Sequence, residues 1–213
     1  MSSPITIITP LAYEARALRA TTHRYGWTLL TCGPGAQGIE RLAMQCKAPT
    51  GHTIVLAGLA GGLDPRLAAG DLIVPEVVLS SDGERFTPPL QLPTAAGILS
   101  SVNEICDSLE AKASQFAESG AHAVDMESAH FATLAVERGW RWGIVRGISD
   151  PAGTTLPKSC ARWVSSDGKL RPLPLLKSLL KDPKTARTLL RLNRSSSKAM
   201  ASVARGLAEL LAT

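Results

Sequence analysis

The most constraining feature of the sequence is the stretch 123–151, which places carboxylates at both ends of a helix and a buried strand. Small and apolar residues recur at helical spacing after Glu127, which predicts a helix. The run 142–148 is short, apolar and partly β-branched, which predicts a buried strand. Pro151 cannot continue a sheet ladder and restricts Asp150 to an extended or turn conformation. We therefore expect Asp150 at the carboxyl end of a strand, where open α/β sheets bind ligands.

Two motifs in this stretch, VDMES at 124–128 and VRGISD at 145–150, resemble the paired signature of the purine nucleoside phosphorylase and nucleosidase superfamily. The resemblance implies an α/β protein with a three-layer α/β/α phosphorylase-like fold around a central mixed, mostly parallel sheet. It also implies that Glu127 binds the ribose hydroxyls. Asp150 would then protonate or hold N7 of the leaving purine.

The same resemblance assigns roles to other residues of the two motifs. Met126 would pack against the sugar, and Ser149 would orient Asp150. Asp125 is either a substrate contact or the N-cap of the helix, and both readings stay open. Arg146 falls on a predicted buried strand, and a buried arginine needs a carboxylate partner. We favour a structural role for Arg146 over ligand contact.

Glu14 lies in the first turn of a helix predicted after the first strand, Ile5–Thr9. A glutamate there is favoured by the positive end of the helix even when it is only solvated. The resemblance adds a second reading, in which this glutamate positions the attacking water. Both readings remain open. The turn 33–35, which opens the next predicted helix, can cradle an anion, but we favour an ordinary turn.

A glycine-rich segment, 58–63, follows a predicted strand at 53–57. Three glycines in this segment permit close approach of the backbone to a ligand. The segment resembles the one whose amides line the sugar and nucleophile pocket in the superfamily. Ala60 and Gly61 are therefore candidate substrate contacts.

The nucleophile is suggested by what this segment lacks. Phosphate-using members carry an arginine and a serine around it, where this chain has Leu56 and Leu59. A phosphate dianion needs charge-assisted donors, so the sequence favours hydrolysis slightly over phosphorolysis. Phosphate stays open as a co-substrate, because another loop or a neighbouring subunit could supply an arginine. We expect no other cofactor and no metal site, since the histidines form no ligand pattern.

The middle of the chain predicts a strand at 72–79, a loop at 80–97 near the pocket mouth, and a strand at 98–105. Histidines beside the VDMES motif could approach a ligand, although an ordinary surface or core role is favoured. The candidates for purine contact or ligand approach are Val102, Asn103, Phe86, Phe116, His122 and His130.

Charge is concentrated at the C-terminus. From residue 168 onward there are ten basic and two acidic residues, a local net charge of +8, against +5 for the whole chain. We expect one domain, 1–213, with 170–213 forming a basic helical extension packed on it; its amphipathic segments are 173–180, 186–192 and 200–211. The basic face is either simply solvated or docks on an anionic membrane. Nucleic-acid binding is disfavoured because the extension lacks aromatics for stacking.

Taken together, Glu14, the AGLAGGLDP segment at 57–65, the two carboxylate motifs and the basic tail look like the hopanoid-associated phosphorylase group. That resemblance implies release of adenine from a 5′-substituted adenosine, adenosylhopane, in hopanoid biosynthesis. The alternatives are a methylthioadenosine/adenosylhomocysteine nucleosidase and a catalytically dead nucleoside-binding module. The resemblance also implies a homo-oligomer. The absence of a basic region before the first apolar run predicts a cytoplasmic protein, peripheral at the inner membrane if the tail docks there.

Overall fold

The computed structural model describes residues 4–157, 159–171 and 184–212 of the chain. Its strands are β1 (Ile5–Thr9), β2 (Thr28–Thr31), β3 (Thr53–Gly62), β4 (Leu72–Ile73), β5 (Val77–Leu79), β6 (Arg85–Phe86), β7 (Ile98–Ser101), β8 (Ala123–Asp125) and β9 (Arg141–Asp150). Its helices are α1 (Ala12–Tyr25), α2 (Gly35–Gln45), α3 (Leu109–Ser119), α4 (Ser128–Glu137) and α6 (Lys184–Leu211), with short 3₁₀ turns η1 (Pro93–Ala95) and η2 (Cys160–Trp163).

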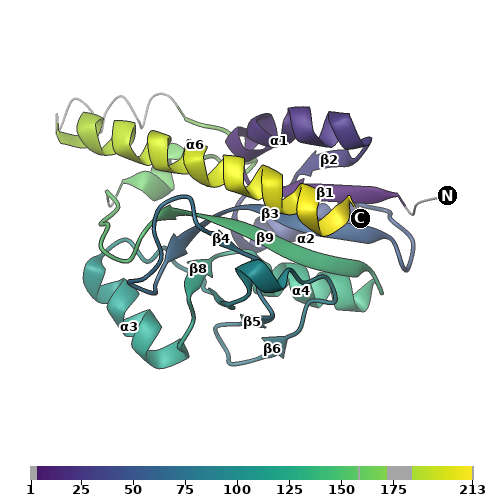
Figure 1. Cartoon of the computed structure of the whole chain (residues 1–213), viewed down its shortest axis with the longest axis horizontal. Helices are drawn as coiled ribbons and strands as arrows, with labels where there is room; N and C mark the ends of the chain where they lie inside the picture. The colour runs from purple at the N-terminus through teal and green to yellow at the C-terminus, as the bar shows by residue number, and fades with distance from the viewer. Residues whose placement is uncertain (1–3, 158, 172–183, 213) are drawn as a thin grey trace.

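These strands form one mixed, mostly parallel sheet with helices on both sides, which confirms the predicted fold class (Figure 1). The strand order is β2-β1-β3-β8-β7-β5-β6, and β9 pairs with both β3 and β4. Parallel pairing joins β1 to β2 and β3, β3 to β9, and β7 to β5 and β8. The antiparallel exceptions in the described chain are β3 with β8, β4 with β9, and β5 with β6.

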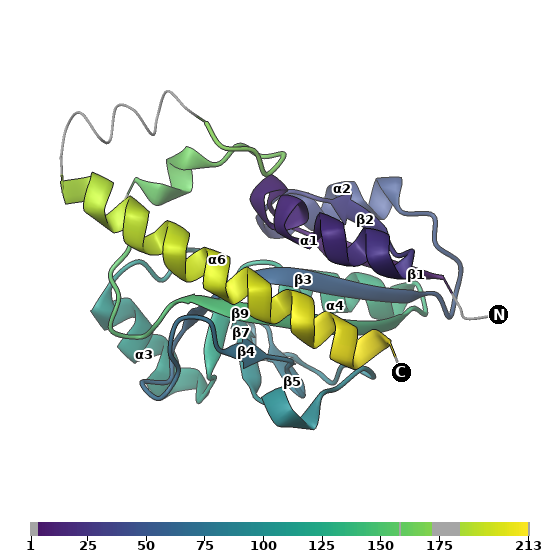
Figure 2. The same ribbon diagram turned by 45° about the horizontal axis from the view of Figure 1, so that its top comes forward.

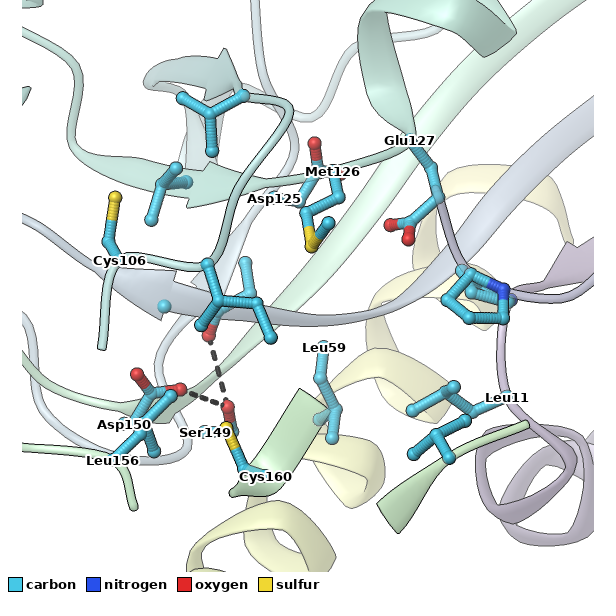
Figure 3. Close-up of a pocket in the computed structure, with 18 of the residues that line it drawn as sticks. Leu11, Leu59, Cys106, Asp125, Met126, Glu127, Ser149, Asp150, Leu156 and Cys160 are labelled. Atoms are coloured by element: carbon cyan, nitrogen blue, oxygen red, sulfur yellow. Dashed lines mark hydrogen bonds between the residues drawn. The ribbon is translucent and has the colours of Figure 1, made fainter. Parts of the chain in front are cut away.

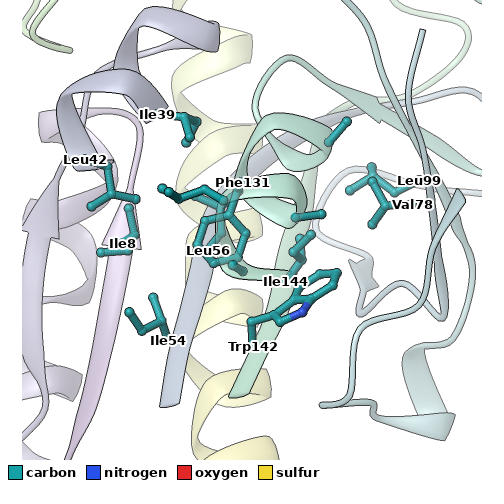
Figure 4. Packing of buried hydrophobic residues seen from close by; sticks show 14 of the residues in the cluster. Ile8, Ile39, Leu42, Ile54, Leu56, Val78, Leu99, Phe131, Trp142 and Ile144 are labelled. Atoms are coloured by element: carbon teal, nitrogen blue, oxygen red, sulfur yellow. The ribbon is translucent and has the colours of Figure 1, made fainter. Parts of the chain in front are cut away.

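The central strands are buried on both faces because successive side chains point to opposite sides of the sheet. One set packs under α2 and α4 (Figure 4): Ile8, Leu56 and Ile144 from the strands, with Ile39, Leu42 and Phe131 from the helices. The neighbouring residues on the same strands point to the opposite face and pack under α1 and α6. They are Ile7, Val55 and Val145, in contact with Leu18, Met200, Val203 and Leu207. This double burial explains why these strands read as continuous apolar runs.

Strands β3 and β9 run side by side, and the end of β9 carries the carboxylate of Asp150. Asp150 is the last residue of β9 and lies opposite Gly61 of β3, so its predicted place at the end of a strand is confirmed. The glycine segment, which we placed after a strand ending at residue 57, instead continues β3 to Gly62. It stays in the sheet because β9 pairs with one part and β8 with its end, with an irregularity between Ala60 and Gly61.

Three further predictions of strand and loop boundaries were wrong. The predicted strand 72–79 is split into β4 and β5 around Pro75, whose missing N–H interrupts the ladder. The predicted loop 80–97 contains β6 and η1, and the strand predicted at 98–105 ends at Ser101.

Helix α6 lies along β9 and beside α1 (Figure 2). The segments 186–192 and 200–211, which we predicted as separate helices, are parts of this one helix; 173–180 lies outside the described residues. Gly147 lets the helix approach the sheet closely, because a Cβ there would stand 2.6 Å from the carbonyl oxygen of Ala199. Among the helices that the structure describes, none is long and apolar enough to cross a membrane.

Candidate active site

A cavity of about 370 Å³ opens where the ends of β3, β8 and β9 meet (Figure 3). Eight of the residues that the sequence suggested for catalysis or substrate binding line this one cavity: Glu14, Ala60, Gly61, Asp125, Met126, Glu127, Ser149 and Asp150. They come from four separate regions of the chain. The sheet topology therefore brings together residues that the sequence only suggested singly.

Glu14 is buried, with 2% of its surface exposed, so it is not the solvated glutamate of the first reading. Its Oε2 accepts a hydrogen bond from the N–H of Leu11 at 2.8 Å, which is half of a capping box at the start of α1. Its Oε1 accepts one from the N–H of Leu59 at 2.8 Å, which ties α1 to β3. Burial raises the pKa of Glu14 to about 7, although Arg146 and the two amides oppose the rise.

Arg146 is fully buried on β9 and has the carboxylate partners that its burial demanded. Its Nη2 contacts Oδ2 of Asp125 and also lies 3.2 Å from Oε2 of Glu127. Burial opposes the charge, but the nearby carboxylates outweigh it and keep the pKa of Arg146 raised. Asp125 also accepts a hydrogen bond from the N–H of Ser128 at 3.2 Å, at the start of α4. The N-cap residue of α4 is Glu127, so the reading of Asp125 as the N-cap was wrong.

Glu127 is held from two sides in the same cluster. Its Oε1 accepts a hydrogen bond from the N–H of Gly35 at 2.8 Å, at the N-terminus of α2, and its Oε2 faces Arg146. The glycine turn thus binds an anion after all, but the anion is the protein's own carboxylate. Burial raises the pKa of Glu127, and Arg146 opposes this. A carboxylate has about four acceptor positions, so Glu127 can still accept from ligand hydroxyls.

Asp150 occupies another part of the cavity and has different partners. Ser149 Oγ lies 2.5 Å from its Oδ1 and 3.3 Å from the carbonyl oxygen of Ala60. Burial raises the pKa of Asp150, and Lys112 opposes this rise. Asp150 therefore holds a proton to higher pH than an exposed aspartate would.

Lys112 is the functional-site residue that the sequence reasoning missed. It lies on α3, is 1% exposed, and its Nζ is 2.7 Å from Oδ2 of Asp150. The two residues are 38 positions apart, and a lysine in a polar helix carries no local signal of burial. Lys112 does not itself line the cavity; it stands behind Asp150.

The cavity surface is otherwise mainly apolar, with leucine, valine, proline and cysteine side chains. Leu11 and Leu59 lie together on the side away from Asp150, whereas Cys106 and Leu156 lie nearer to it (Figure 3). Among its described lining residues there is no lysine, arginine or histidine. Within the same described residues, no group of three or more His, Cys, Asp or Glu side chains is arranged to hold a metal ion.

Several candidates for ligand contact do not line this cavity. Val102 lines the cavity as predicted. Asn103 does not, because it is exposed and its amide faces Ser81. No residue of the described segment 80–97 reaches the cavity, so the predicted pocket-mouth loop was wrong. The other candidates pack elsewhere in the described structure or face solvent: Phe86, Phe116, His122 and His130.

Part of this site lies in a segment that is similar to a known sequence family. Residues 84–168 match the Phosphorylase superfamily. No curated protein sequence matches the chain. The matched segment contains Lys112, both carboxylate motifs and Asp150, whereas Glu14 lies outside it.

Solved structures extend the likeness to the whole fold. A futalosine hydrolase mutant from Helicobacter pylori aligns with a TM-score of 0.69 and 14% identity over 99% of each chain. The 5′-methylthioadenosine/S-adenosylhomocysteine nucleosidase of the same organism gives a TM-score of 0.68 and 14% identity, over 99% of this chain and 98% of that chain. Its namesake from Colwellia psychrerythraea, in complex with adenine, gives 0.67 and 16%, over 100% and 96%. The chain shares the fold of these nucleosidases.

Proposed function

We propose that the chain is a nucleosidase of the Phosphorylase superfamily that cleaves the N-glycosidic bond of a 5′-substituted adenosine and releases adenine. The observation that carries this proposal is the convergence of Glu14, Glu127 and Asp150 on one apolar cavity. All three carboxyls have raised pKa values, and Glu14 and Asp150 are the two that we assign to proton transfer. The solved relatives that are named nucleosidases or hydrolases support the same reaction class.

The reaction breaks the bond between C1′ and N9 through an oxocarbenium-like transition state. Asp150 donates its proton to N7 of the purine, and the electron pair of the breaking bond moves to the base. Glu127 accepts hydrogen bonds from the ribose hydroxyls and fixes the sugar. Water bonds to C1′ while Glu14, in its ionised form, accepts a proton from it. Adenine leaves neutral, with the proton on N7. Glu14 then loses its proton to solvent and Asp150 takes one up from solvent, so that both carboxyls return to their starting forms.

Water is a better nucleophile than phosphate for this cavity. Its described lining carries five carboxyl groups, on Glu14, Glu104, Asp125, Glu127 and Asp150, and no basic side chain. Among the described residues, Arg146 contacts two of these carboxyls, but it is buried beneath the cavity and engaged by Asp125 and Glu127. A phosphate dianion would therefore meet negative charge without a charge-assisted donor. We propose hydrolysis, with no cofactor.

The 5′ substituent is proposed to be large and apolar, as in adenosylhopane. Leu11 and Leu59 support this, since both line the cavity with apolar side chains and their main-chain amides bind the water-holding Glu14. A methylthioadenosine/adenosylhomocysteine nucleosidase is the second candidate, favoured by the fold shared with enzymes of that name. The two differ in the size of the 5′ group that the cavity admits.

The setting of the reaction is part of the same proposal. Helix α6 exposes Arg191, Arg194, Lys198 and Arg205, which can attract an anionic membrane surface. We propose a cytoplasmic homo-oligomer that touches the inner membrane through this face. Binding to anionic vesicles should weaken as salt rises, and binding that survives neutralisation of these four residues would refute the contact.

The decisive experiment measures adenine release from 5′-alkyl-5′-deoxyadenosines and from methylthioadenosine, with and without phosphate. Equal release in both buffers, increasing in kcat/KM with the length of the alkyl group, is the expected result. Strict dependence on phosphate would replace hydrolysis with phosphorolysis. A preference for methylthioadenosine would favour the second candidate, and no release from any of them would reject the nucleosidase.

A further inference from the structure

Lys112 is a buried lysine without an assigned role. It projects from α3, is 1% exposed, and does not line the cavity. Burying an ammonium group is costly unless its protons are hydrogen-bonded and its charge is paired. A methionine or leucine would pack at such a place without that cost, so the partners of the ammonium group explain its role best.

All three ammonium protons of Lys112 have an acceptor at the end of β9. Nζ donates to Oδ2 of Asp150 at 2.7 Å, to the main-chain oxygen of Asp150 at 2.9 Å, and to that of Pro151 at 3.0 Å. Three bonds from one group fix both the carboxyl and the main chain that carries it. An ammonium group has three protons to donate and cannot accept a hydrogen bond, so these three bonds use its full hydrogen-bonding capacity.

This arrangement makes the two oxygens of Asp150 different. Oδ2 faces a group that only donates, so a proton on Oδ2 would oppose the Lys112 ammonium. Oδ1 lies beside Ser149, whose hydroxyl can donate or accept and which lines the cavity (Figure 3). The carboxyl proton therefore belongs on Oδ1, the oxygen turned toward the cavity.

We propose that Lys112 is a positioning residue for Asp150: it directs the acidic proton to Oδ1 and supplies the counter-charge for the carboxylate that remains after proton donation. This inference rests on the proposed function. When Asp150 gives its proton to N7, a charge appears on a buried carboxyl, and a fixed ammonium at 2.7 Å stabilises it at that moment.

Few other charged or titratable groups act on this pair. Cys106, on the loop before α3, interacts with both Lys112 and Asp150, and burial raises the pKa of its thiol, so it stays neutral. Asp107 acts on Cys106, and Ser149 completes the shell around Asp150. Lys112 is thus the cation that the described residues place against Asp150.

The test compares pH profiles of kcat/KM for the wild type and Lys112→Met, with exposed Lys47→Met as the control. Activity needs protonated Asp150, and loss of the ammonium makes ionisation of Asp150 harder. We expect the alkaline limb of Lys112→Met to move up by at least one pH unit and its maximal kcat to fall at least tenfold. In an Asp150→Asn background, the same substitution should cost less than threefold.

A lysine that only supports the fold would give a different pattern. Lys112→Met would then lower activity equally at every pH, leave the limb in place, and cost as much in the Asp150→Asn background; any of these results would overturn the proposal. If Lys112→Met does not fold, Lys112→Gln keeps two donors without the charge and must show the same shift of the limb.

A substrate-free measurement separates this inference from the proposed function. Carboxyl ¹³C NMR, assigned with Asp150→Asn, follows the titration of Asp150 directly. We expect its midpoint to rise by at least one pH unit in the Lys112 variant. An unchanged midpoint overturns the inference even in an active enzyme. If the wild type releases no adenine but the Asp150 midpoint still shifts in the Lys112 variant, the coupling is supported and the nucleosidase is rejected.

Discussion

Oε2 of Glu127 lies 3.2 Å from Nη2 of Arg146, and the same nitrogen also contacts Asp125. One fully buried guanidinium thus joins two carboxylates, and Glu14 is close by, because Glu14 and Arg146 both lie against the same side of Gly58. Burial raises the pKa of Glu14, and the nearby Glu127 adds to the rise, whereas Arg146 opposes it. The site is therefore electrostatically one unit, and changes in Arg146 should affect all of it.

Arg146→Met should destabilise the protein by about 3–5 kcal/mol, because it leaves buried carboxylates without their cation. Urea unfolding at pH 7 measures this loss. Arg19→Met, which changes an exposed arginine on α1, is the matched control and should leave the midpoint nearly unchanged. Equal effects of the two substitutions would contradict the buried-cluster account.

Asp150→Asn should lower kcat for adenine release by about 10²–10⁴-fold, since the amide cannot donate a proton as an acid does. The side-chain oxygen of asparagine can still accept from Lys112, so the fold should persist. Circular dichroism checks the fold, and exposed Asp82→Asn serves as the control. An Asp150→Asn enzyme with wild-type kcat would remove Asp150 from the mechanism.

The pH dependence of kcat/KM should report Glu14. The water-activating form is the carboxylate, and the pKa of Glu14 is raised to about 7, so kcat/KM should rise as pH increases through about 7. Glu14→Gln should lower kcat/KM at least about a hundredfold and abolish this acid limb. The control Glu40→Gln, at an exposed position, should retain the wild-type kcat/KM and the acid limb. An acid limb near pH 4.5 would mean that Glu14 titrates as an ordinary carboxyl.

Glu14 should also make stability depend on pH in a defined direction. Its folded pKa of about 7 exceeds the ordinary value of 4.5, so the folded state holds the proton more tightly than the unfolded state. The resulting stabilisation is full below pH 4.5 and is lost as pH rises to 7, about 3 kcal/mol at about 1.4 kcal/mol per pH unit. Urea unfolding at pH 4 and pH 8 should show the wild type losing this amount relative to Glu14→Gln. A constant difference would argue against the raised pKa.

Local sequence signals placed the carboxylates well. Pro151 after an apolar run located Asp150 at a strand end, and β-branched residues located β1 and hence Glu14 after it. These signals act within a few residues of the group they predict, so they survive without knowledge of the fold.

Contacts made across the sheet carried no such signal. The Gly35 amide that binds Glu127 is 92 residues away from it, and Lys112 is 38 residues from Asp150. A glycine in a turn and a lysine in a helix are ordinary where they stand, and only the pairing of β3, β8 and β9 gives them partners. Likewise, the length of β3 depended on neighbours that the sequence does not reveal locally.

Gly58 offers a test of how closely the charged groups are fitted together. A Cβ at this position would stand 2.6 Å from Oε1 of Glu14 and 2.8 Å from Nη1 of Arg146. Both side chains are buried, and Glu14 is held by two main-chain amides, so neither can move aside without breaking these contacts. Gly58→Ala should therefore lower kcat/KM at least tenfold and destabilise the protein by about 1–3 kcal/mol.

The matched control for Gly58→Ala is Gly153→Ala, because a Cβ at Gly153 meets no atom of the described structure within 4 Å. This variant should retain activity and stability, so that any loss in Gly58→Ala reflects crowding of Glu14 and Arg146. The pH profile adds a second readout. Displacement of Glu14 from the Leu59 amide removes a hydrogen bond that favours the carboxylate, so the acid limb of Gly58→Ala should move above pH 7. An unshifted limb with full activity would show that Glu14 does not depend on the space at Gly58.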